Sequence, residues 1–345
     1  MHKRTGPFRE SIFAAMPEIQ GISVVIPNYN GELLLPQILP AASLALEQSG
    51  LPHEIIVVDD CSTDHSLLIL QEDFPSVKIL KNEMNRGFSV TSNKGIRAAL
   101  HDWVLLLNSD VKLEPDYFGP LLKYAARDKV FGVMGRIVGW EDEIIQDGAK
   151  YPFFHGLKIK TSGNYLLQDR DAMREGIYSM YLSGANAFLN KKIFLETGGL
   201  NEIFSPFYVE DFELSLRAWR LGFVCFFDYY AVCRHRTSVT IAAGNRKRKI
   251  KKIYNRNKMF LHAIHLDRTR RFFWFLQLAG ESIIHLLTLR WSFLQAVFAF
   301  IRNYDKVKQS RRQFHSAAVG KKLLSVAEVA DKIHASISGR TAEFF

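Results

Sequence analysis

The strongest constraint on the fold is a repeated pattern in the first third of the chain, where short apolar runs alternate with longer segments of helical character. Four runs rich in Val, Ile and Leu fit buried strands, at residues 22–26, 54–58, 77–80 and 103–107. Helices are expected between them, at residues 32–48, 64–71 and 89–100. Strands that alternate with helices favour a mostly parallel, doubly wound α/β sheet, whose ligands bind at the carboxyl ends of the strands.

Polar, turn-forming segments follow these strands, with the sequences PNYN, DDCSTD, NEMNRG and NSD. Side chains alternate along a strand, so the adjacent Asp59 and Asp60 cannot both point the same way. One is suited to the turn and the other to a hydrogen bond from a base or ribose, although both could serve the turn. Asp110 brings a carboxylate to the same edge, which suits Mg²⁺ or Mn²⁺, with a helix cap as the alternative.

Two further motifs lie in the second half of the chain. Glu210 and Asp211 open an amphipathic helix that is expected to run to Arg220 and to end at Gly222. Acids at a helix N-terminus are stabilised by the helix dipole, so capping is one interpretation, and an ionised general base is the other. His235 stands just past a strand among polar neighbours, which suits a metal ligand, although a lone His is more often structural.

The net charge of +10 comes from one segment of the chain. Residues 244–271 contain eleven Lys or Arg and one acidic residue, Asp267, so the remainder is neutral overall. A concentrated basic segment favours a polyanion or an anionic membrane surface. We do not expect nucleic acid, because the segment lacks the interleaved aromatic residues on which bases stack.

Residues 272–301 are almost wholly apolar and at first resemble a membrane span. Their polar side chains recur every three or four residues and share one helical face, namely Gln277, Glu281, His285, Thr288, Ser292 and Gln295. The stripe predicts an amphipathic helix or helical pair. It either packs on the catalytic domain as ordinary core or lies in the plane of a membrane beside the basic segment, and a true span is the third reading.

The N-terminal residues and the cysteines indicate the cellular compartment and the division of the chain into parts. Residues 1–20 lack the apolar core of a signal peptide and are expected to be a lead-in. The three cysteines form no CxxC pair, which favours a reducing, cytoplasmic compartment. We therefore expect three parts: a lead-in at 1–20, a catalytic domain at 21–240, and a basic, amphipathic helical extension at 241–345.

The motifs resemble the family 2 glycosyltransferases when they are taken together and in order. They are SVVIPNYNG, VVDDCSTD, NRGFSVTSNKGI, LLLNSDV, YLSGANAFLNKKIFLETGGLNE, FYVEDFELSLRAWRLGF and His235. The resemblance covers about residues 21–240, and bacterial rhamnosyltransferase-like enzymes of surface-polysaccharide assembly are the most similar in pattern. It implies a GT-A fold with a C-terminal helical extension, and inverting, metal-dependent transfer from a UDP or dTDP sugar.

The resemblance also assigns roles to individual residues. Asp211 would be the catalytic base, with Glu210 close to the acceptor, and Asp110 and His235 would bind Mg²⁺ or Mn²⁺. The implied nucleotide-sugar-binding residues are Pro27, Asn28, Tyr29, Asp60, Asn85, Gly87, Asn108, Ser109, Asp110, Gly184 and Ala185. The triplet Asn108-Ser109-Asp110 departs from the family pattern because its first position is not acidic. Asp110 therefore carries more of the metal site.

The expected partners are a nucleotide-sugar donor, a saccharide acceptor that is lipid-linked, and a membrane surface met through residues 245–301. The protein would then be cytoplasmic and peripheral on the inner face of the cell membrane. A nucleotidyltransferase is the first alternative, but PNYNGE lacks the glycine-rich, Lys/Arg-bearing loop of that class. A non-catalytic nucleotide-sugar-binding protein is the second, and it would need neither Asp110 nor Asp211. The sequence does not predict the sugar, the linkage or the oligomeric state.

Overall fold

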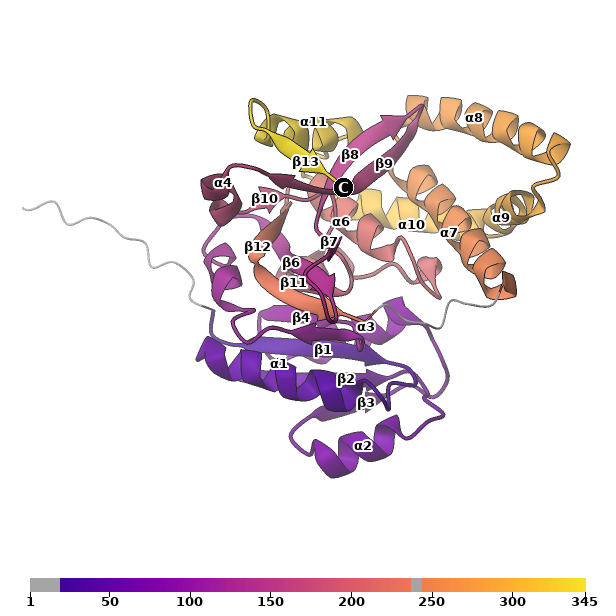
Figure 1. Ribbon diagram of the computed structural model, residues 1–345. Helices are drawn as coiled ribbons and strands as arrows, with labels where there is room; N and C mark the ends of the chain where they lie inside the picture. Colours follow the sequence, from indigo (N-terminus) through magenta and orange to yellow (C-terminus); the bar gives the residue numbers. More distant parts are fainter. Residues whose placement is uncertain (1–18, 237–243) are drawn as a thin grey trace, which may run out of the picture.

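The structure, a computed structural model, describes residues 19–236 and 244–345. A large mixed sheet forms the centre, and helices cover both of its faces (Figure 1). The helices that follow residue 244 gather around a smaller sheet in the upper part of Figure 1. Of the lead-in expected at 1–20, only the last two residues lie within the described part of the chain.

The central sheet has the strand order β10-β12-β6-β11-β4-β1-β2-β3. Outside this order, β5 pairs with β12 and β7 pairs with β6. Its strands are β1 (Ile22–Asn28), β2 (His53–Asp59), β3 (Lys78–Lys81), β4 (Trp103–Leu107), β5 (Val111–Leu113), β6 (Val130–Gly139), β7 (Ile145–Asp147), β10 (Ile177–Tyr178), β11 (Asn186–Asn190) and β12 (Val224–His235). The first four are mutually parallel, as the sequence predicts, while β11 runs antiparallel between β4 and β6.

The helices of the first part also follow the predicted order. They are α1 (Leu35–Ser49), α2 (Ser66–Asp73), α3 (Phe88–Ala98), α4 (Arg170–Glu175), α5 (Lys191–Glu196) and α6 (Glu210–Arg220), with short 3₁₀ turns η1 (Gly119–Tyr124) and η2 (Glu202–Phe204). Helix α1 begins after Glu32 and carries Pro36 in its first turn, where the missing N–H of proline costs nothing. Helix α6 matches the segment expected from Asp211 to Arg220.

Alternating side chains of the central strands build a core on each face of the sheet. On β1, Val25 belongs to the core that also contains residues of α3 and α6, while Val24 and Ile26 belong to the core that contains residues of α1 and α2. All three side chains are fully buried. A strand covered on both faces needs a continuous apolar run, which is why the sequence signal of these strands is strong.

A second, three-stranded sheet stands above the first. It consists of the hairpin β8 (Ala149–His155) and β9 (Lys158–Leu167), with β13 (Ala342–Phe344) antiparallel to β9. The hairpin starts directly after β7 and projects towards the C-terminal helices (Figure 1). It therefore connects the edge of the central sheet to the C-terminal part of the chain.

The C-terminal part is helical, as the sequence predicts. It contains α7 (Gly244–His265), α8 (Arg268–Leu287), α9 (Trp291–Arg302), α10 (Tyr304–Ala317) and α11 (Val326–Ser336). The apolar segment 272–301 is thus a helical pair, broken at Leu289, whose φ is 53°. No helix in the described ranges combines the length and the apolar character needed to cross a membrane.

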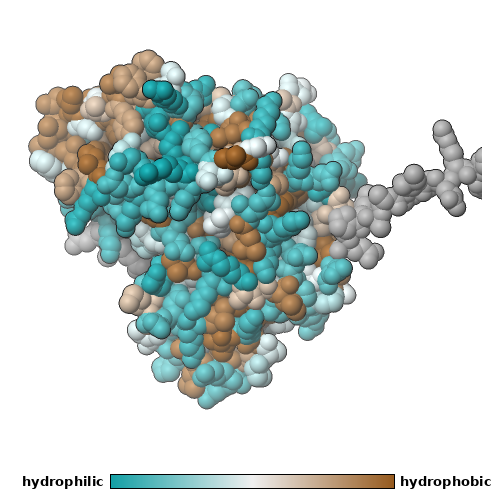
Figure 2. Space-filling view, turned by 180° about the vertical axis from the view of Figure 1, so that it is seen from behind, coloured by the Kyte–Doolittle hydropathy of each residue, from teal (hydrophilic) through white to brown (hydrophobic). Residues whose placement is uncertain are grey.

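The helices α8 and α9 are amphipathic, but many of their large apolar side chains lie on the outer surface. Trp274 and Phe300 point inward and are buried in the core. The α8 part of the predicted polar stripe also faces the protein, because Gln277 accepts a hydrogen bond from the backbone of Leu157 at 3.2 Å and Glu281 forms an ion pair with Lys158. Large apolar side chains therefore cover the outer surface, as the brown area at the upper left of Figure 2 shows. They are Phe272, Phe273, Leu276, Ile283, Ile284, Leu286, Leu287, Leu289, Trp291, Phe298 and Ile301.

A buried ionic network joins α6 to α7. Glu213 accepts hydrogen bonds from Arg217 and from His265, whose Nε2 lies 2.9 Å from Glu213 Oε1. Burial alone would raise the pKa of Glu213, but Arg217 and His265 outweigh it and lower that pKa to about 2. Burial lowers the pKa of His265 and of His262, each to about 4, so both imidazoles are neutral in the fold.

The two buried histidines predict a loss of stability in mild acid. Each has an ordinary pKa of 6.5 and binds a proton more readily in the unfolded chain, so the free energy of unfolding decreases as pH falls from 6.5 towards 4. We expect the two histidines together to contribute a loss of about 2–3 kcal/mol between about pH 7.5 and about pH 5.5. The raised pKa of Glu210 acts in the opposite direction, so the histidine contribution is measured by urea unfolding as the difference between the unaltered protein and a histidine variant. His265→Gln should remove about half of the histidine contribution, and an unchanged pH dependence would contradict the assignment.

Candidate functional site

The candidate site lies where the parallel strands β1, β2 and β4 end, at one edge of the central sheet (Figure 1). The turns after these strands are tied to one another by backbone hydrogen bonds. The N–H of Asp60 donates to Asn28 O at 2.8 Å, and the N–H of Asn82 donates to Asp59 O at 2.8 Å. The sequence motifs PNYN, DDCSTD and NEMNRG are thereby brought together.

The three predicted nucleotide-binding residues at the end of β1 differ in their exposure to solvent. Asn28 is only 1 % exposed, and its Nδ2 donates to Asp59 Oδ1 at 3.2 Å, so this amide holds β1 to β2. Pro27 is half-buried, and Tyr29 is 52 % exposed. Of the three, the Tyr29 ring is the most accessible surface for a planar ligand.

Asp60 organises the loop that precedes α3. Its Oδ1 accepts hydrogen bonds from Asn82 Nδ2 and the Arg86 N–H, and its Oδ2 accepts from the Gly87 N–H, each at 2.8 Å. The neighbouring Asp59 serves its own turn, because its Oδ2 accepts from the Ser62 N–H at 3.0 Å. Oδ2 of Asp60 retains one lone pair for a ligand.

Gly87 connects this loop to the segment before α6. Its φ is 81°, and a Cβ at this position would approach the backbone of Pro206 to 3.1 Å. The following N–H, of Phe88, donates to Pro206 O at 3.2 Å. Asn85 is exposed on the same loop. Glycine is therefore needed here for both its backbone conformation and its small size.

Asp110 and His235 meet at the next position along the edge. Strand β12 pairs with β5, with His235 opposite Val111, and the Nε2 of His235 lies 3.4 Å from Asp110 Oδ2. The hydrogen bond to Asp110 is the main reason why the pKa of His235 lies above its usual value. The other oxygen of Asp110, Oδ1, is buried without a hydrogen-bond partner in the described structure.

Gln146 on β7 orients the imidazole. The Nδ1 of His235 lies 2.7 Å from Gln146 Oε1, which can only accept a hydrogen bond. Nδ1 therefore carries a proton, and in the neutral ring the lone pair of Nε2 is free to bind a cation beside Asp110.

The segment Gly184–Ala185 connects the turn that contains Asp110 with Asp211 at the start of α6. The N–H of Asn108 donates to Ala185 O at 3.0 Å, and the N–H of Gly184 donates to Asp211 Oδ2 at 3.3 Å. A Cβ on Gly184 would come within 3.2 Å of the Phe88 ring. Asn108 and Ser109 are half-buried in the turn that leads to Asp110.

Glu210 and Asp211 form a coupled acidic pair at the start of α6. Burial and the charge of Asp211 raise the pKa of Glu210 to about 8, and burial likewise raises the pKa of Asp211. Asp211 accepts hydrogen bonds from the N–H groups of Gly184 and Phe212, whereas Glu210 Oε2 has no partner among the described residues. Glu210, with its raised pKa, retains its proton at neutral pH, and the two backbone N–H groups favour the ionised form of Asp211.

The backbone that leads into this pair is strained. Tyr208 and Val209 have φ values of 74° and 76°, which cost roughly 1–3 kcal/mol each for residues with a Cβ. Asn257 of α7 holds the segment, because its Nδ2 lies 2.7, 3.1 and 2.8 Å from the carbonyl oxygens of Phe204, Phe207 and Tyr208. Two N–H bonds serve three acceptors, so one is shared.

The sequence did not predict four residues that shape this site: Gln146, Asp147, Lys150 and Asn257. Asp147 is ion-paired with Lys150 and lies near enough to raise the pKa of both Asp211 and His235. Only Asn257 left a sequence signal, since it occupies the apolar stripe of α7 four residues after Ile253. A buried Asn at such a position needs hydrogen-bond partners from elsewhere.

Comparison with known proteins identifies a family. The model of "Glycosyl transferase family 2" matches residues 23–198. An undecaprenyl-phosphate 4-deoxy-4-formamido-L-arabinose transferase of Pectobacterium carotovorum is 36 % identical over 124 residues, which are 35 % of this chain and 37 % of that protein. An uncharacterized glycosyltransferase of Haemophilus influenzae is 32 % identical over 195 residues, 56 % of this chain and 61 % of that protein. Both alignments span less than two thirds of the relative's length.

The fold is also found among solved structures. A crystal structure of GalNAc-T7 with UDP, GalNAc and Mn²⁺ superposes with a TM-score of 0.58 at 17 % identity, covering 73 % of this chain and 49 % of that one. Identity this low bears on the fold alone. It confirms the predicted GT-A architecture with its central mixed sheet.

Asn257 provides a test of how the site is held. Asn257→Ala leaves three buried carbonyls without their donor, at a cost of about 1–3 kcal/mol for each unpaired group. We expect faster amide hydrogen exchange at residues 204–211, while the strands of the central sheet stay protected. Asn255→Ala on the same helix should leave exchange unchanged. Equal exchange in the two variants would show that α7 does not restrain the segment.

Proposed function

The chain belongs to glycosyl transferase family 2, and on that premise we propose that it transfers a sugar from a nucleotide diphosphate to an acceptor hydroxyl. The observation that carries the proposal is the bridge formed by Gly184–Ala185, which sets the turn before Asp110 beside Asp211. In this proposal the carboxylate that would bind a metal and the carboxylate that would act as general base lie on one sheet edge, which supports group transfer from a diphosphate.

The chemistry of Asp110 and His235 fits a divalent cation. Oδ1 of Asp110 is buried without a hydrogen-bond partner among the residues that the structure describes, and such an atom is costly unless a ligand uses it. Within the described ranges no three His, Cys, Asp or Glu side chains form a metal cluster, so the protein would supply two ligands here and the donor diphosphate others. Mg²⁺ or Mn²⁺ bound at this position would offset the charge that develops on the departing diphosphate.

The acidic pair supplies the proton transfer. Asp211, ionised and held by two backbone N–H groups, accepts the proton of the acceptor hydroxyl as its oxygen attacks the anomeric carbon. The bond from that carbon to the diphosphate oxygen breaks, and the nucleoside diphosphate leaves with the electron pair. Attack from the opposite face inverts the anomeric configuration. Glu210 stays protonated beside Asp211 and lies close to the acceptor.

The remaining roles follow from position on the edge. Tyr29 and Pro27 would receive the base and Asp60 would bind it, with Asn85 and Gly87 nearby and Asn28 supporting the turn. Asn108 and Ser109 would line the diphosphate, and Gly184 and Ala185 the donor sugar. The nucleoside of the donor is uridine or thymidine in this proposal.

The acceptor is proposed to be a lipid-linked saccharide in cell-surface polysaccharide synthesis. The Pectobacterium relative is named as an undecaprenyl-phosphate transferase. The outer surface of α8 and α9 supports a membrane location, because exposed apolar patches of this extent mark interaction sites. The protein would act from the cytoplasm, peripheral on the inner face of the cell membrane, with residues 245–301 meeting the lipid.

The role of Asp211 is tested by Asp211→Asn. We expect turnover to fall by about 10²–10⁴-fold, with donor affinity retained, because general-base assistance typically has this magnitude. Steady-state kinetics and calorimetric binding of the donor would measure both. Glu210→Gln is the matched control: it mimics the protonated acid that Glu210 already is at neutral pH, so turnover and the acid limb of the pH–rate profile should stay close to those of the unaltered protein, while any change caused by ionisation of Glu210 near pH 8 should disappear. Near-normal turnover in Asp211→Asn would exclude it as the base.

The metal site is tested through Gln146. Gln146→Ala frees the His235 ring, so we expect about 10–100-fold weaker apparent affinity for Mg²⁺ or Mn²⁺. Turnover at saturating metal should be largely retained, and a chelator should abolish the activity of the unaltered protein. The exposed Gln168→Ala serves as control. Activity that persists in excess chelator would contradict the metal-dependent mechanism.

A further inference from the structure

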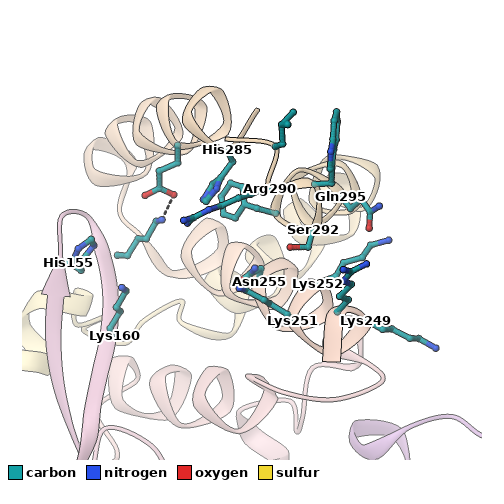
Figure 3. Close-up of a pocket in the computed structure, with 16 residues that line it drawn as sticks. His155, Lys160, Lys249, Lys251, Lys252, Asn255, His285, Arg290, Ser292 and Gln295 are labelled. Carbon is teal, nitrogen blue, oxygen red and sulfur yellow. Dashed lines mark hydrogen bonds and ion pairs between the residues drawn. The ribbon is translucent and has the colours of Figure 1, made fainter. Parts of the chain in front are cut away.

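A large cavity lies apart from the sheet edge, between the β8–β9 hairpin, α7 and the α8–α9 turn. Its volume is ≈ 1180 Å³. Figure 3 shows Lys160 on the hairpin, Lys251 on α7 and Arg290 in the turn, on three walls of this space. The polar stripe of α8 and α9 supplies His285, Ser292 and Gln295 to the same lining. None of these residues has a role in the transfer described above.

The cavity is strongly positive. Seven Lys or Arg line it but only one acid, Glu281, whose carboxylate is already engaged by Lys158 and by Gln277 Nε2 at 3.0 Å. Lys160, Lys251 and Arg290 form no ion pair with any residue in the described ranges. Burial and the charge of Arg290 lower the pKa of His285. Like charges that converge on a hollow repel one another unless an anion occupies it.

The surroundings of the cavity identify the kind of anion. The side chains of Leu289 and Trp291, at its rim, are 67 % and 58 % exposed and continue into the apolar outer surface of α8 and α9. A basic hollow next to an apolar surface matches a molecule with a phosphate group and a hydrocarbon chain. A soluble polyanion would match the charge and leave the apolar surface uncovered.

The β8–β9 hairpin sets the distance from the cavity to the reacting groups. Gln146 and Asp147 stand at the site, and β8 runs from Ala149 to His155 at the cavity. Seven extended residues span about 24 Å. A phosphate in the cavity and a hydroxyl beside Asp211 are therefore separated by more than one sugar residue.

We propose that this cavity binds the phosphate or diphosphate of a polyprenyl-linked oligosaccharide acceptor, while the apolar outer surface of α8 and α9 lies in the bilayer. The inference rests on the glycosyltransferase function proposed above and adds the place at which the acceptor lipid is recognised. The saccharide then extends along the hairpin to Asp211. Lys160, Lys251 and Arg290 recognise the phosphate and take no part in the transfer of the donor sugar.

The test is flotation with three kinds of vesicle: phosphatidylcholine alone, phosphatidylcholine with a polyprenyl phosphate, and phosphatidylcholine with phosphatidylglycerol at equal surface charge. The unaltered protein should bind the polyprenyl phosphate vesicles best. Replacement of Lys160, Lys251 and Arg290 by Ala should reduce that binding by about tenfold or more. Inorganic diphosphate should compete with it.

Two matched variants separate this site from overall charge. Lys160→Arg, Lys251→Arg and Arg290→Lys together keep the charge of the cavity and should keep the preference. Lys192→Ala, Arg312→Ala and Lys332→Ala together remove three exposed cations elsewhere and should also keep it. Lys251→Ala alone, at an exposed position, repeats the measurement if the triple replacement unfolds the protein.

The possible outcomes lead to distinct conclusions. Equal binding to phosphatidylglycerol vesicles, or an unchanged preference in the alanine variant, would overturn the inference, as would tighter binding to a nucleic acid than to the polyprenyl phosphate. Donor hydrolysis in the presence of Mg²⁺ or Mn²⁺ should be the same in all variants. If the unaltered protein neither binds nor hydrolyses a nucleotide sugar, the proposed function fails, whereas normal donor chemistry without lipid preference refutes the cavity assignment alone.

Discussion

Burying Glu210 beside Asp211 costs free energy, because two carboxylates removed from water disfavour each other's charge. The protein reduces that cost by keeping one proton on the pair and by directing the N–H groups of Gly184 and Phe212 at Asp211. The rest of the site is arranged around this pair. Gly184 belongs to the segment that contacts the turn before Asp110, and the strained entry to α6 is held by Asn257. Helix α7 of the C-terminal part thus contacts the segment that leads to the acids.

The sequence predicts the parallel half of the fold because β1, β2 and β4 contain runs that are buried on both faces. Val24, Val25 and Ile26 form a continuous apolar run that few other structures would accommodate. The site is less accessible to such reasoning. Asp110 and His235 are neighbours because β5 pairs with β12 in antiparallel orientation. The hydrophobic periodicity of a three-residue strand does not predict which strand it pairs with. The residue pattern indicated Asp110 and His235 separately as possible metal ligands, and the family resemblance assigned them to one metal site. Neither gave any indication of Gln146, which comes from a segment without a motif.

Helices α8 and α9 show a different limit. The spacing of Gln277, Glu281 and His285 correctly predicts that they share a face, but a periodic stripe does not reveal what that face meets. In most surface helices the polar side meets water. Here the β8–β9 hairpin offers Lys158 and the backbone of Leu157 to the stripe, so the polar side turns inward. Because the polar side of α8 and α9 faces inward, it lines the basic cavity and leaves the apolar side on the outer surface.

The pairing of β13 with β9 bears on how the protein forms during synthesis. The N–H and C=O of Asn164 exchange hydrogen bonds with Phe345, and β13 covers the open edge of β9. The hairpin leaves the ribosome long before these residues do, and an uncovered strand edge is a template for pairing with other chains. The central sheet is complete in sequence once β12 has been made, whereas the hairpin must wait for β13, more than 100 residues later. A nascent chain would thus possess a folded donor side well before its second sheet is closed, and this interval is when the protein is most exposed to aggregation.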